Sequence, residues 1–337
     1  MSGSHEAAVK TDTFWGQLQP ARTGAPSVGP ERRPPPWLGG YRLLRRIGVG
    51  GMAEVFLARR VAPSPRAKLI ALKRILPELS KHPGAQLMFS READILTRLR
   101  HPNIVQVDDV AAAAQGYYTM ALIDGPRIPD LVRGAQASGQ RLPFEHVVEL
   151  VGQAACGLHH AHECRDHAGR PFDVVHCDVS PANLMIDRAG RLKLLDFGIA
   201  QTRDHRVDPR DIPRAGTLAY MSPEQRRGHR VDRRSDVFSL GIVLWELAVW
   251  RRAPRAKPRP GTAGLEPPLP APRTVDPRLP PRLDAILVRA LSPDPVRRFG
   301  SAAEFGAALS ELRRSTTVRP EHSLGAWVRR HTTPPSA

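Results

Sequence analysis

Cysteine is scarce in this sequence, and long apolar runs are absent. The three cysteines, Cys156, Cys164 and Cys177, have none of the spacings that bind zinc or build a disulfide framework. No stretch reaches the roughly 18 apolar residues that a membrane-spanning helix needs, and no secretory signal is recognisable. Four histidines between positions 159 and 167 lie outside the apolar stripe of a predicted helix, so we expect them on a solvated face. These absences predict a soluble protein of the reducing cytoplasm, without a metal cluster or a membrane span.

Acidic residues are also few. The chain has 33 Asp and Glu residues against 50 Lys and Arg residues, which gives a net charge of +17 and a pI near 11.0. Such a composition is found in nucleic-acid-binding proteins, but the arginines here are scattered and are not interleaved with aromatic residues. We therefore expect no nucleic-acid partner, and the charge fits an acidic protein substrate better. Nothing in the sequence specifies an oligomeric state.

The two ends of the chain differ in composition from its middle. Residues 1–38 are rich in Pro, Gly, Ser and Arg and lack apolar periodicity, which predicts a disordered leader. Residues 314–337 form a short segment in which we expect a flexible C-terminal tail. The remaining residues, 39–313, are enough for one domain with a sizeable core.

The most informative stretch runs from residue 174 to residue 198. It places Asp178, Asn183 and Asp196 on two loops that one predicted hairpin, residues 184–194, joins. The hairpin returns both loops to the same edge, so the three side chains can converge. Such convergence suits phosphoryl transfer, in which positioning and charge neutralisation by magnesium account for most of the catalysis. The two loops resemble the catalytic loop and the Asp-Phe-Gly segment of protein kinases.

A glycine-rich turn lies between two predicted strands, residues 41–47 and 54–59. It resembles the kinase loop whose backbone amides approach the phosphates of ATP. A third glycine of that pattern would fall at position 53, which is alanine here. The residues that the resemblance assigns to this loop and to the roof over the nucleotide are Ile47, Gly48, Val49, Gly50, Gly51, Met52, Ala53, Val55 and Ala71.

Lys73 lies on the inward face of a short predicted strand, where it needs a negative partner. In the helix predicted over residues 85–99, Glu92 falls within the apolar stripe. A solvated surface pair is the usual outcome for lysine and glutamate, but both charges here fall on faces that the pattern predicts to be buried. We therefore expect Lys73 and Glu92 to pair and hold the nucleotide, like the strand lysine and C-helix glutamate of kinases.

A predicted strand over residues 117–120 runs into residues 121–125, which resemble the hinge between the two lobes of a kinase. By that resemblance Met120 is the gatekeeper, and backbone groups of Ala121 and Ile123 bond the adenine ring. The resemblance as a whole covers about residues 41–312.

The resemblance implies a bilobal protein kinase fold of the α+β class within residues 39–313. Its N-lobe, at about 41–120, is a small antiparallel β-sheet with one helix, and its C-lobe, at about 124–313, is larger and mainly helical. The implied function is that of a serine/threonine protein kinase, which transfers the γ-phosphate of ATP to hydroxyls of protein substrates and uses ATP and Mg²⁺. Ser-Pro after the catalytic aspartate is most similar to bacterial kinases of the myxobacterial kind.

The resemblance also assigns roles to single residues. Asp178 orients the substrate hydroxyl and accepts its proton, and Asn183 and Asp196 hold the metal on the ATP phosphates. Thr217 packs against Asp178 and favours serine or threonine as the acceptor. Asp236 holds the backbone of the catalytic loop from beneath.

Three departures from the family leave a second hypothesis open. Cys177 replaces an arginine that would bind an activation-loop phosphate, and Ser180 replaces a lysine that helps to neutralise the transferring phosphate. The prolines of residues 251–281 predict an irregular basic segment in place of a docking helix. The alternative to an active kinase is therefore an ATP-binding scaffold with little catalysis. The stretch that follows Asp196 and ends at Glu224 resembles the activation segment of kinases, and Glu224 is still expected to pair with Arg298 and tie this segment to the C-lobe.

Thr202 is the only hydroxyl-bearing residue between Phe197 and Gly216. Because Cys177 also replaces the phosphate-binding arginine, we expect an activity that does not require phosphorylation of this segment.

Overall fold

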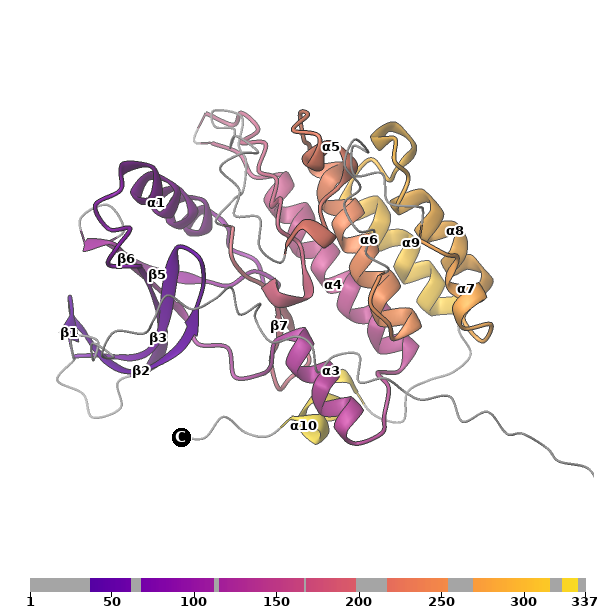
Figure 1. Ribbon diagram of the computed structural model, residues 1–337, viewed down its shortest axis with the longest axis horizontal. Coiled ribbons are helices and arrows are strands. Elements are labelled where there is room, and N and C mark those ends of the chain that lie inside the picture. Colours follow the sequence, from indigo (N-terminus) through magenta and orange to yellow (C-terminus); the bar gives the residue numbers. More distant parts are fainter. Residues whose placement is uncertain are drawn as a thin grey trace, which may run out of the picture.

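The computed structural model describes residues 37–61, 68–111, 115–166, 168–197, 217–253, 269–315 and 323–332. It has a strand-rich N-lobe and a larger helical C-lobe, shown in indigo and in magenta to yellow in Figure 1. This arrangement confirms the predicted α+β bilobal fold. The predicted leader lies outside the described residues except at its end, where Trp37 and Leu38 form a strand that pairs with Tyr41 and Arg42.

The N-lobe is an antiparallel sheet in the order β1-β2-β3-β4-β6-β5. Its strands are β1 (Trp37–Leu38), β2 (Tyr41–Val49), β3 (Ala53–Arg60), β4 (Leu69–Ile75), β5 (Val107–Ala111) and β6 (Tyr117–Ala121). Helix α1 (Pro83–Arg98) begins after His82, whose ring accepts a hydrogen bond from the Ala85 amide. The helix packs on the sheet through Phe89, whose ring lies 5.3 Å from that of Tyr118. Its apolar stripe, which includes Glu92, therefore faces the core as predicted.

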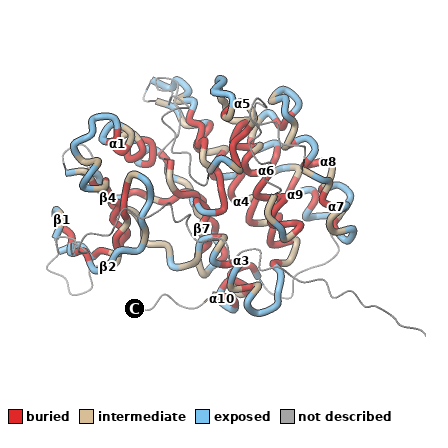
Figure 2. The backbone as a smooth tube through the Cα atoms, in the orientation of Figure 1, coloured by how far each residue is buried: buried red, intermediate tan, exposed pale blue. Residues whose placement is uncertain are grey.

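Three long helices form the centre of the C-lobe: α4 (Phe144–His162), α6 (Arg233–Val249) and α9 (Ala302–Ser315). Around them lie α3 (Ile128–Ala137), α5 (Pro223–Arg226), α7 (Pro272–Val275), α8 (Pro281–Ala290), α10 (Leu324–His331), strands β7 (Leu184–Ile186) and β8 (Leu192–Leu194), and short 3₁₀ turns at Pro181–Asn183, Thr217–Ala219 and Pro295–Arg297. Nearly all of α6 is buried, and α4 and α6 run through the red interior of Figure 2. Among the described helices, none is both long and apolar enough to cross a membrane.

Two predictions for the C-lobe are wrong in part. His162 is not on a solvated face: it is buried, and its Nε2 lies 2.8 Å from Asp236. Helix α7 lies inside the proline-rich stretch 251–281, because Pro272 occupies the first turn of a helix, where proline loses no hydrogen bond. Residues 254–268 of that stretch lie outside the described part of the chain.

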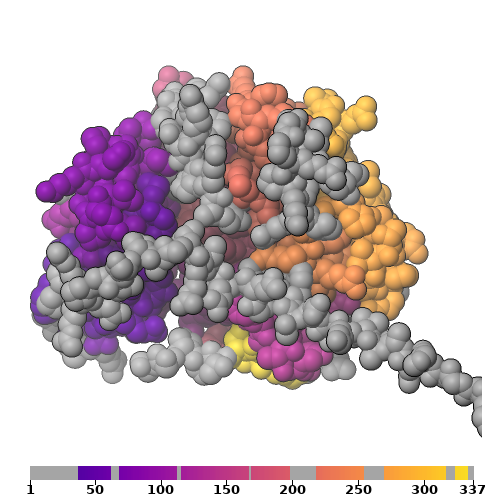
Figure 3. Space-filling model, viewed as in Figure 1, coloured from indigo at the N-terminus to yellow at the C-terminus, as the bar shows by residue number. Residues whose placement is uncertain are grey.

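Helix α10 lies within the span predicted as a flexible tail, so that prediction is wrong for residues 324–331. The remaining tail residues, 316–322 and 333–337, are outside the described part, and α9 ends only at Ser315. Figure 3 shows the yellow α10 beside the magenta α3 at the lower edge of the C-lobe.

Helix α10 is held closely against the turn between β7 and β8. A Cβ at Gly190 would lie 2.7 Å from the Gly325 nitrogen, so two glycines allow the backbones to approach. The guanidinium of Arg329 donates to the carbonyl oxygen of Arg188 in the same turn. Trp327 is only 5% exposed, and it is the largest of the buried side chains of the helix.

Replacing Trp327 with alanine should lower the free energy of unfolding by about 3–5 kcal/mol, the usual cost of deleting a buried aromatic side chain. Urea denaturation measures the difference. The matched control is Trp37→Ala, because Trp37 is 52% exposed and its loss should change stability by less than about 0.5 kcal/mol. Equal small effects in both variants would mean that α10 does not contribute to folding.

Candidate active site

The register of the N-lobe sheet brings the predicted nucleotide residues onto one face. In one cross-strand row Val55 lies opposite both Gly48 and Lys73. In the next row Ala71 lies opposite Met120. Because directly opposed residues share a face of the sheet, these side chains line one surface between the glycine-rich turn and the hinge.

The glycine-rich turn is closed by a hydrogen bond from the Gly50 amide to the Ala53 carbonyl oxygen, 2.7 Å long. Ala53 is buried in the core, so the alanine that replaces the third glycine does not obstruct the turn. A Cβ at Gly51 would meet nothing within 4 Å. No neighbouring atom therefore requires glycine at position 51, and the space beside its backbone is open. Of the other predicted loop residues, Ile47 and Val49 are exposed and Met52 is half-buried.

The hinge is fixed by backbone contacts on both sides. The Ala121 amide donates to the Gln106 carbonyl oxygen at 2.9 Å, so that amide is not the group that could bond an adenine. The Gly125 amide donates to the carbonyl oxygen of Ile123 at 3.1 Å. A Cβ at Gly125 would overlap the Ile186 carbonyl oxygen, at 1.9 Å, so only glycine lets the hinge lie against β7.

Lys73 is the centre of an ionic cluster. Its Nζ lies 2.8 Å and 2.9 Å from the two carboxylate oxygens of Glu92 and 2.7 Å from Asp196 Oδ1. The predicted Lys73–Glu92 contact is therefore present, and both residues are buried. Sequence reasoning missed Tyr118, which lies opposite Lys73 in the sheet and has its ring centre 5.7 Å from Nζ. The alternation of residues in β6, which puts 118 and 120 on one face, was the signal for it.

The cluster shifts the pKa of each member. Burial opposes the charge on Lys73, but the carboxylates of Asp196 and Glu92 raise its pKa well above the ordinary lysine value. Burial raises the pKa of Glu92 against the effect of the nearby ammonium. Burial also disfavours the charge on Asp196, yet Lys73 lowers the pKa of Asp196 below its ordinary value. Lys73 is thus held charged between two carboxyl groups.

Lys73→Met should reduce phosphate transfer by at least about a hundredfold without unfolding the domain. Burial already favours the protonated form of Glu92, so this carboxyl can take up a proton when its cation is lost. A carboxyl group whose pKa is raised by folding destabilises the folded state as pH rises. The melting temperature of Lys73→Met should therefore fall from pH 5 to pH 8 more than that of the wild type.

Glu92→Gln should reduce phosphate transfer less than Lys73→Met does, because the amide keeps a hydrogen-bond acceptor for Lys73. Unchanged kinetics and melting in both variants would contradict a role in the site.

The catalytic loop is fixed from beneath by Asp236, as predicted. This fully buried carboxylate accepts hydrogen bonds from the amides of His176, at 2.8 Å, and Cys177, at 2.9 Å. Sequence reasoning missed His162 as its third partner. Cys177 has a φ of +63°, which is a left-handed conformation that a residue with a side chain adopts only when its surroundings hold it.

His176 connects the two loops and was not assigned a role from sequence. Its Nε2 lies 3.0 Å from the Leu195 carbonyl oxygen, and its Nδ1 accepts from the Asp178 amide at 3.3 Å. These partners assign the proton to Nε2, because Nδ1 has to accept. The His176 ring also packs 4.3 Å from that of Phe197. The buried imidazole therefore joins the catalytic loop to the segment that carries Asp196.

Asp178, Asn183 and Asp196 converge as predicted. Asn183 Nδ2 donates to Asp178 Oδ2 at 2.8 Å and to its carbonyl oxygen at 2.9 Å. The Leu195 amide donates to the Asn183 carbonyl oxygen at 2.9 Å, so the residue before Asp196 is bonded to the backbone of Asn183. An amide oxygen and a carboxylate are hard oxygen donors, the kind that Mg²⁺ takes together with substrate phosphates and water. The residues therefore fit a divalent cation.

The activation segment is described only near its end. Thr217 begins a 3₁₀ turn, but its side chain lies outside the described residues, as does the stretch from 198 to 216. Glu224 and Arg298 form the predicted pair, with two hydrogen bonds of 2.7 and 2.8 Å between their planar groups. This contact ties the end of the segment to the base of the C-lobe.

Comparison with known families decides the classification. Residues 41–262 match the family described as protein kinase domain. The chain belongs to the protein kinase family. Tyrosine-protein kinase MasK of Myxococcus xanthus is 38% identical over 301 residues, which are 87% of this chain and 46% of MasK. Serine/threonine-protein kinase PknB of Mycobacterium leprae is 34% identical over 279 residues, 80% of this chain and 42% of PknB.

A third similar kinase is serine/threonine-protein kinase pkn3 of Myxococcus xanthus. It is 33% identical over 305 residues, which are 85% of this chain and 53% of pkn3. All three relatives are bacterial and two are from Myxococcus xanthus, which confirms the predicted similarity to bacterial kinases of the myxobacterial kind. The chain spans about half the length of these relatives.

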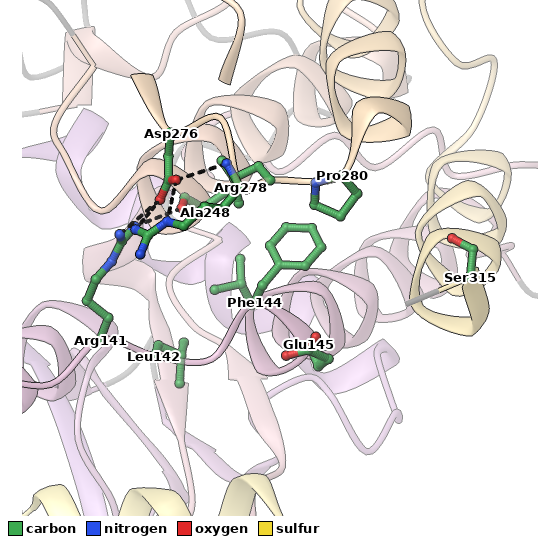
Figure 4. A pocket seen from close by; sticks show the side chains of 11 residues that line it. Arg141, Leu142, Phe144, Glu145, Ala248, Asp276, Arg278, Pro280 and Ser315 are labelled. Atoms are coloured by element: carbon green, nitrogen blue, oxygen red, sulfur yellow. Dashed lines mark hydrogen bonds and ion pairs between the residues drawn. The ribbon is translucent and has the colours of Figure 1, made fainter. Parts of the chain in front are cut away.

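The kinase domain also contains a cavity of about 450 Å³ far from the site just described. It opens at the Phe144 end of α4, about 27 Å along the helix from the His162 end that adjoins the catalytic loop. Figure 4 shows Asp276 on its rim accepting hydrogen bonds from Arg141 and Arg278. Hydrogen bonds from these arginines hold the pKa of Asp276 far below its ordinary value. None of the residues that line this cavity belongs to the cluster around Lys73 or to the loops that carry Asp178 and Asp196, so the cavity is separate from the kinase site.

Proposed function

We propose that this kinase domain transfers the γ-phosphate of ATP to hydroxyl groups of protein substrates. The observation that supports this most strongly is the contact of the buried pair Lys73 and Glu92 with Asp196, beside the bonded pair of Asp178 and Asn183. A buried lysine held by one carboxylate next to a second, partly exposed carboxylate is the arrangement that phosphoryl transfer needs, since positioning and charge neutralisation provide most of the catalysis.

Each part of the site has a proposed task. The sheet face with Val55, Ala71 and Met120 covers the adenine ring, which the Ala121 carbonyl oxygen and the Ile123 amide bond. Backbone amides of residues 47–53 cover the phosphates, and Lys73 neutralises part of their charge while Glu92 keeps it in place. Asn183 and Asp196 would hold Mg²⁺, which would neutralise further phosphate charge when bound. Asp178 orients the acceptor hydroxyl and takes its proton.

We propose serine and threonine as the acceptor residues, with Thr217 beside Asp178 as the selecting residue. The similar kinases carry both kinds of name, since MasK is named a tyrosine-protein kinase and PknB and pkn3 are named serine/threonine-protein kinases. The net charge of +17 favours acidic protein substrates. The proposed location is the cytoplasm.

A second candidate function is an ATP-binding scaffold with little catalysis, and one observation favours it. Ser180, at the position of the phosphate-neutralising lysine, is only 6% exposed and carries no charge. It therefore cannot replace that lysine in neutralising the transferring phosphate, so kcat should be low if the lysine is essential.

Phosphoamino-acid analysis tests both proposals. The purified domain is incubated with labelled ATP, Mg²⁺ and a general protein acceptor, and the acceptor is then hydrolysed in acid. We expect label on phosphoserine and phosphothreonine. Label on phosphotyrosine alone would contradict the proposed acceptor, and binding of ATP without any label would favour the scaffold.

A further inference from the structure

Cys177 is held in its left-handed conformation by side chains from two different elements. Asp236 of α6 accepts from its amide at 2.9 Å, and Nε2 of Gln225 in α5 donates to its carbonyl oxygen at 2.9 Å. Cys177 is 2% exposed, so water does not reach the residue freely. Asp178 follows directly, and its position depends on the backbone conformation of Cys177.

Gln225 uses both ends of its amide. Its Oε1 accepts from the Ser222 amide and hydroxyl, both at 3.0 Å, while Nε2 donates to Cys177. The backbone partners fix the amide orientation, because the Ser222 N–H requires an oxygen and the Cys177 carbonyl requires a donor. Gln225 is 5% exposed. One buried side chain thus joins the catalytic loop to the start of α5, which ends the activation segment.

We propose that Gln225 is a positioning residue that sets the catalytic loop against the end of the activation segment without phosphorylation. The link consists of hydrogen bonds between neutral groups of Ser222, Gln225 and Cys177, and none of these bonds needs a phosphate. This inference rests on the proposed kinase function, because its effect is on the orientation of Asp178.

The Nε2 group of Gln225 is the part of the side chain that affects the position of Asp178. If this donor were removed, the buried carbonyl oxygen of Cys177 would lose its hydrogen bond from Gln225, and such a loss is unfavourable in a protein interior. The left-handed backbone would also lose one of the two contacts described above, and it could relax toward a more common conformation. Either change would move Asp178 relative to the acceptor hydroxyl, and small misplacements reduce kcat strongly.

Gln225→Glu isolates this donor. The introduced carboxyl group still accepts from Ser222 but, when ionised, cannot donate to Cys177. We expect kcat to fall about tenfold to a hundredfold at pH 8 while the dissociation constant of ATP stays within twofold. Protonation restores a donor, so the ratio of variant to wild-type kcat should rise as the pH is lowered from 8 to 6. Gln225→Leu, which never has a donor, should show no such rise.

Ser222→Ala is the matched control. It removes the hydroxyl from the helix cap but keeps the Gln225–Cys177 bond, so its kcat should stay within about threefold of the wild type. A loss equal to that of Gln225→Glu would assign the effect to the cap and overturn the inference. A pH-independent ratio for Gln225→Glu, or full activity in Gln225→Leu, would overturn it as well.

Hydrogen exchange separates this inference from the proposed function. Amides of residues 174–179 should exchange faster in Gln225→Glu than in the wild type or in Ser222→Ala, whether or not phosphate is transferred. An inactive wild type with this exchange pattern would contradict the kinase function alone. An active wild type with identical exchange in all three proteins would contradict the role of Gln225 alone.

Discussion

Asp196→Ala should abolish metal-dependent phosphate transfer and leave the fold intact. The carboxylate is one of the two oxygen groups proposed to hold the cation, so its loss should lower kcat by at least about a thousandfold. Its side chain is 37% exposed, and Lys73 keeps its contact with Glu92, so folding should suffer little. Transfer of labelled phosphate and circular dichroism of the same sample measure the two effects.

The matched control for this variant is Asp94→Ala. Asp94 is also a carboxylate in an ion pair, with Arg98 at 3.2 Å, but it lies exposed on the surface of α1. Its removal should leave kcat unchanged, because Asp94 lies outside the proposed site. The free energy of unfolding should fall by less than about 1 kcal/mol, the usual contribution of an exposed ion pair. Full activity of Asp196→Ala would remove Asp196 from the proposed site.

Arg298→Met should lower the free energy of unfolding by about 3–5 kcal/mol, because it leaves the carboxylate of Glu224 buried without its cation. Both side chains of this pair are less than 10% exposed. For a domain of this size the loss corresponds to a fall of roughly 10 °C in melting temperature. The control is Arg282→Met, which breaks an exposed pair with Glu311 and should cost less than about 1 kcal/mol.

The same pair predicts a pH dependence. Burial opposes the charge of Glu224, but hydrogen bonds from Arg298 and Ser235 lower its pKa below the ordinary value. A carboxylate with a lowered pKa stabilises the fold above its unfolded pKa, and that contribution is lost as the pH falls through the folded pKa. The difference in stability between wild type and Arg298→Met should therefore be largest at neutral pH and shrink in acid. A difference that stays constant from pH 7 to pH 3 would contradict this account.

The site could be predicted from the sequence where local pattern and chemistry agreed. The burial of Glu92 followed from the spacing of apolar residues in α1, and its pairing with Lys73 followed because a buried charge needs a partner. The convergence of Asp178, Asn183 and Asp196 followed from one short hairpin. The bond between Glu224 and Arg298, 74 positions apart, came from the family resemblance alone.

Other features could not be predicted, because they depend on contacts between distant segments. Helix α10 has only eight residues, and it packs against the turn between β7 and β8, whose glycine no local pattern connects with it. The burial of His162 depends on Asp236, which lies 74 positions away on another helix. No local pattern distinguishes Gln225 from other polar residues, because its contact with the Cys177 carbonyl oxygen joins positions 48 apart in the chain.

The central claim is that this site transfers phosphate, and one measurement tests it most directly. Wild-type protein and Asp178→Asn are incubated with labelled ATP and Mg²⁺, and label on protein is followed over time. The substitution keeps the shape of the side chain but removes the group proposed to take the proton of the acceptor hydroxyl. We predict steady labelling by the wild type and a rate at least about a hundredfold lower for Asp178→Asn. Equal rates for the two proteins, or no labelling by either, would contradict the account.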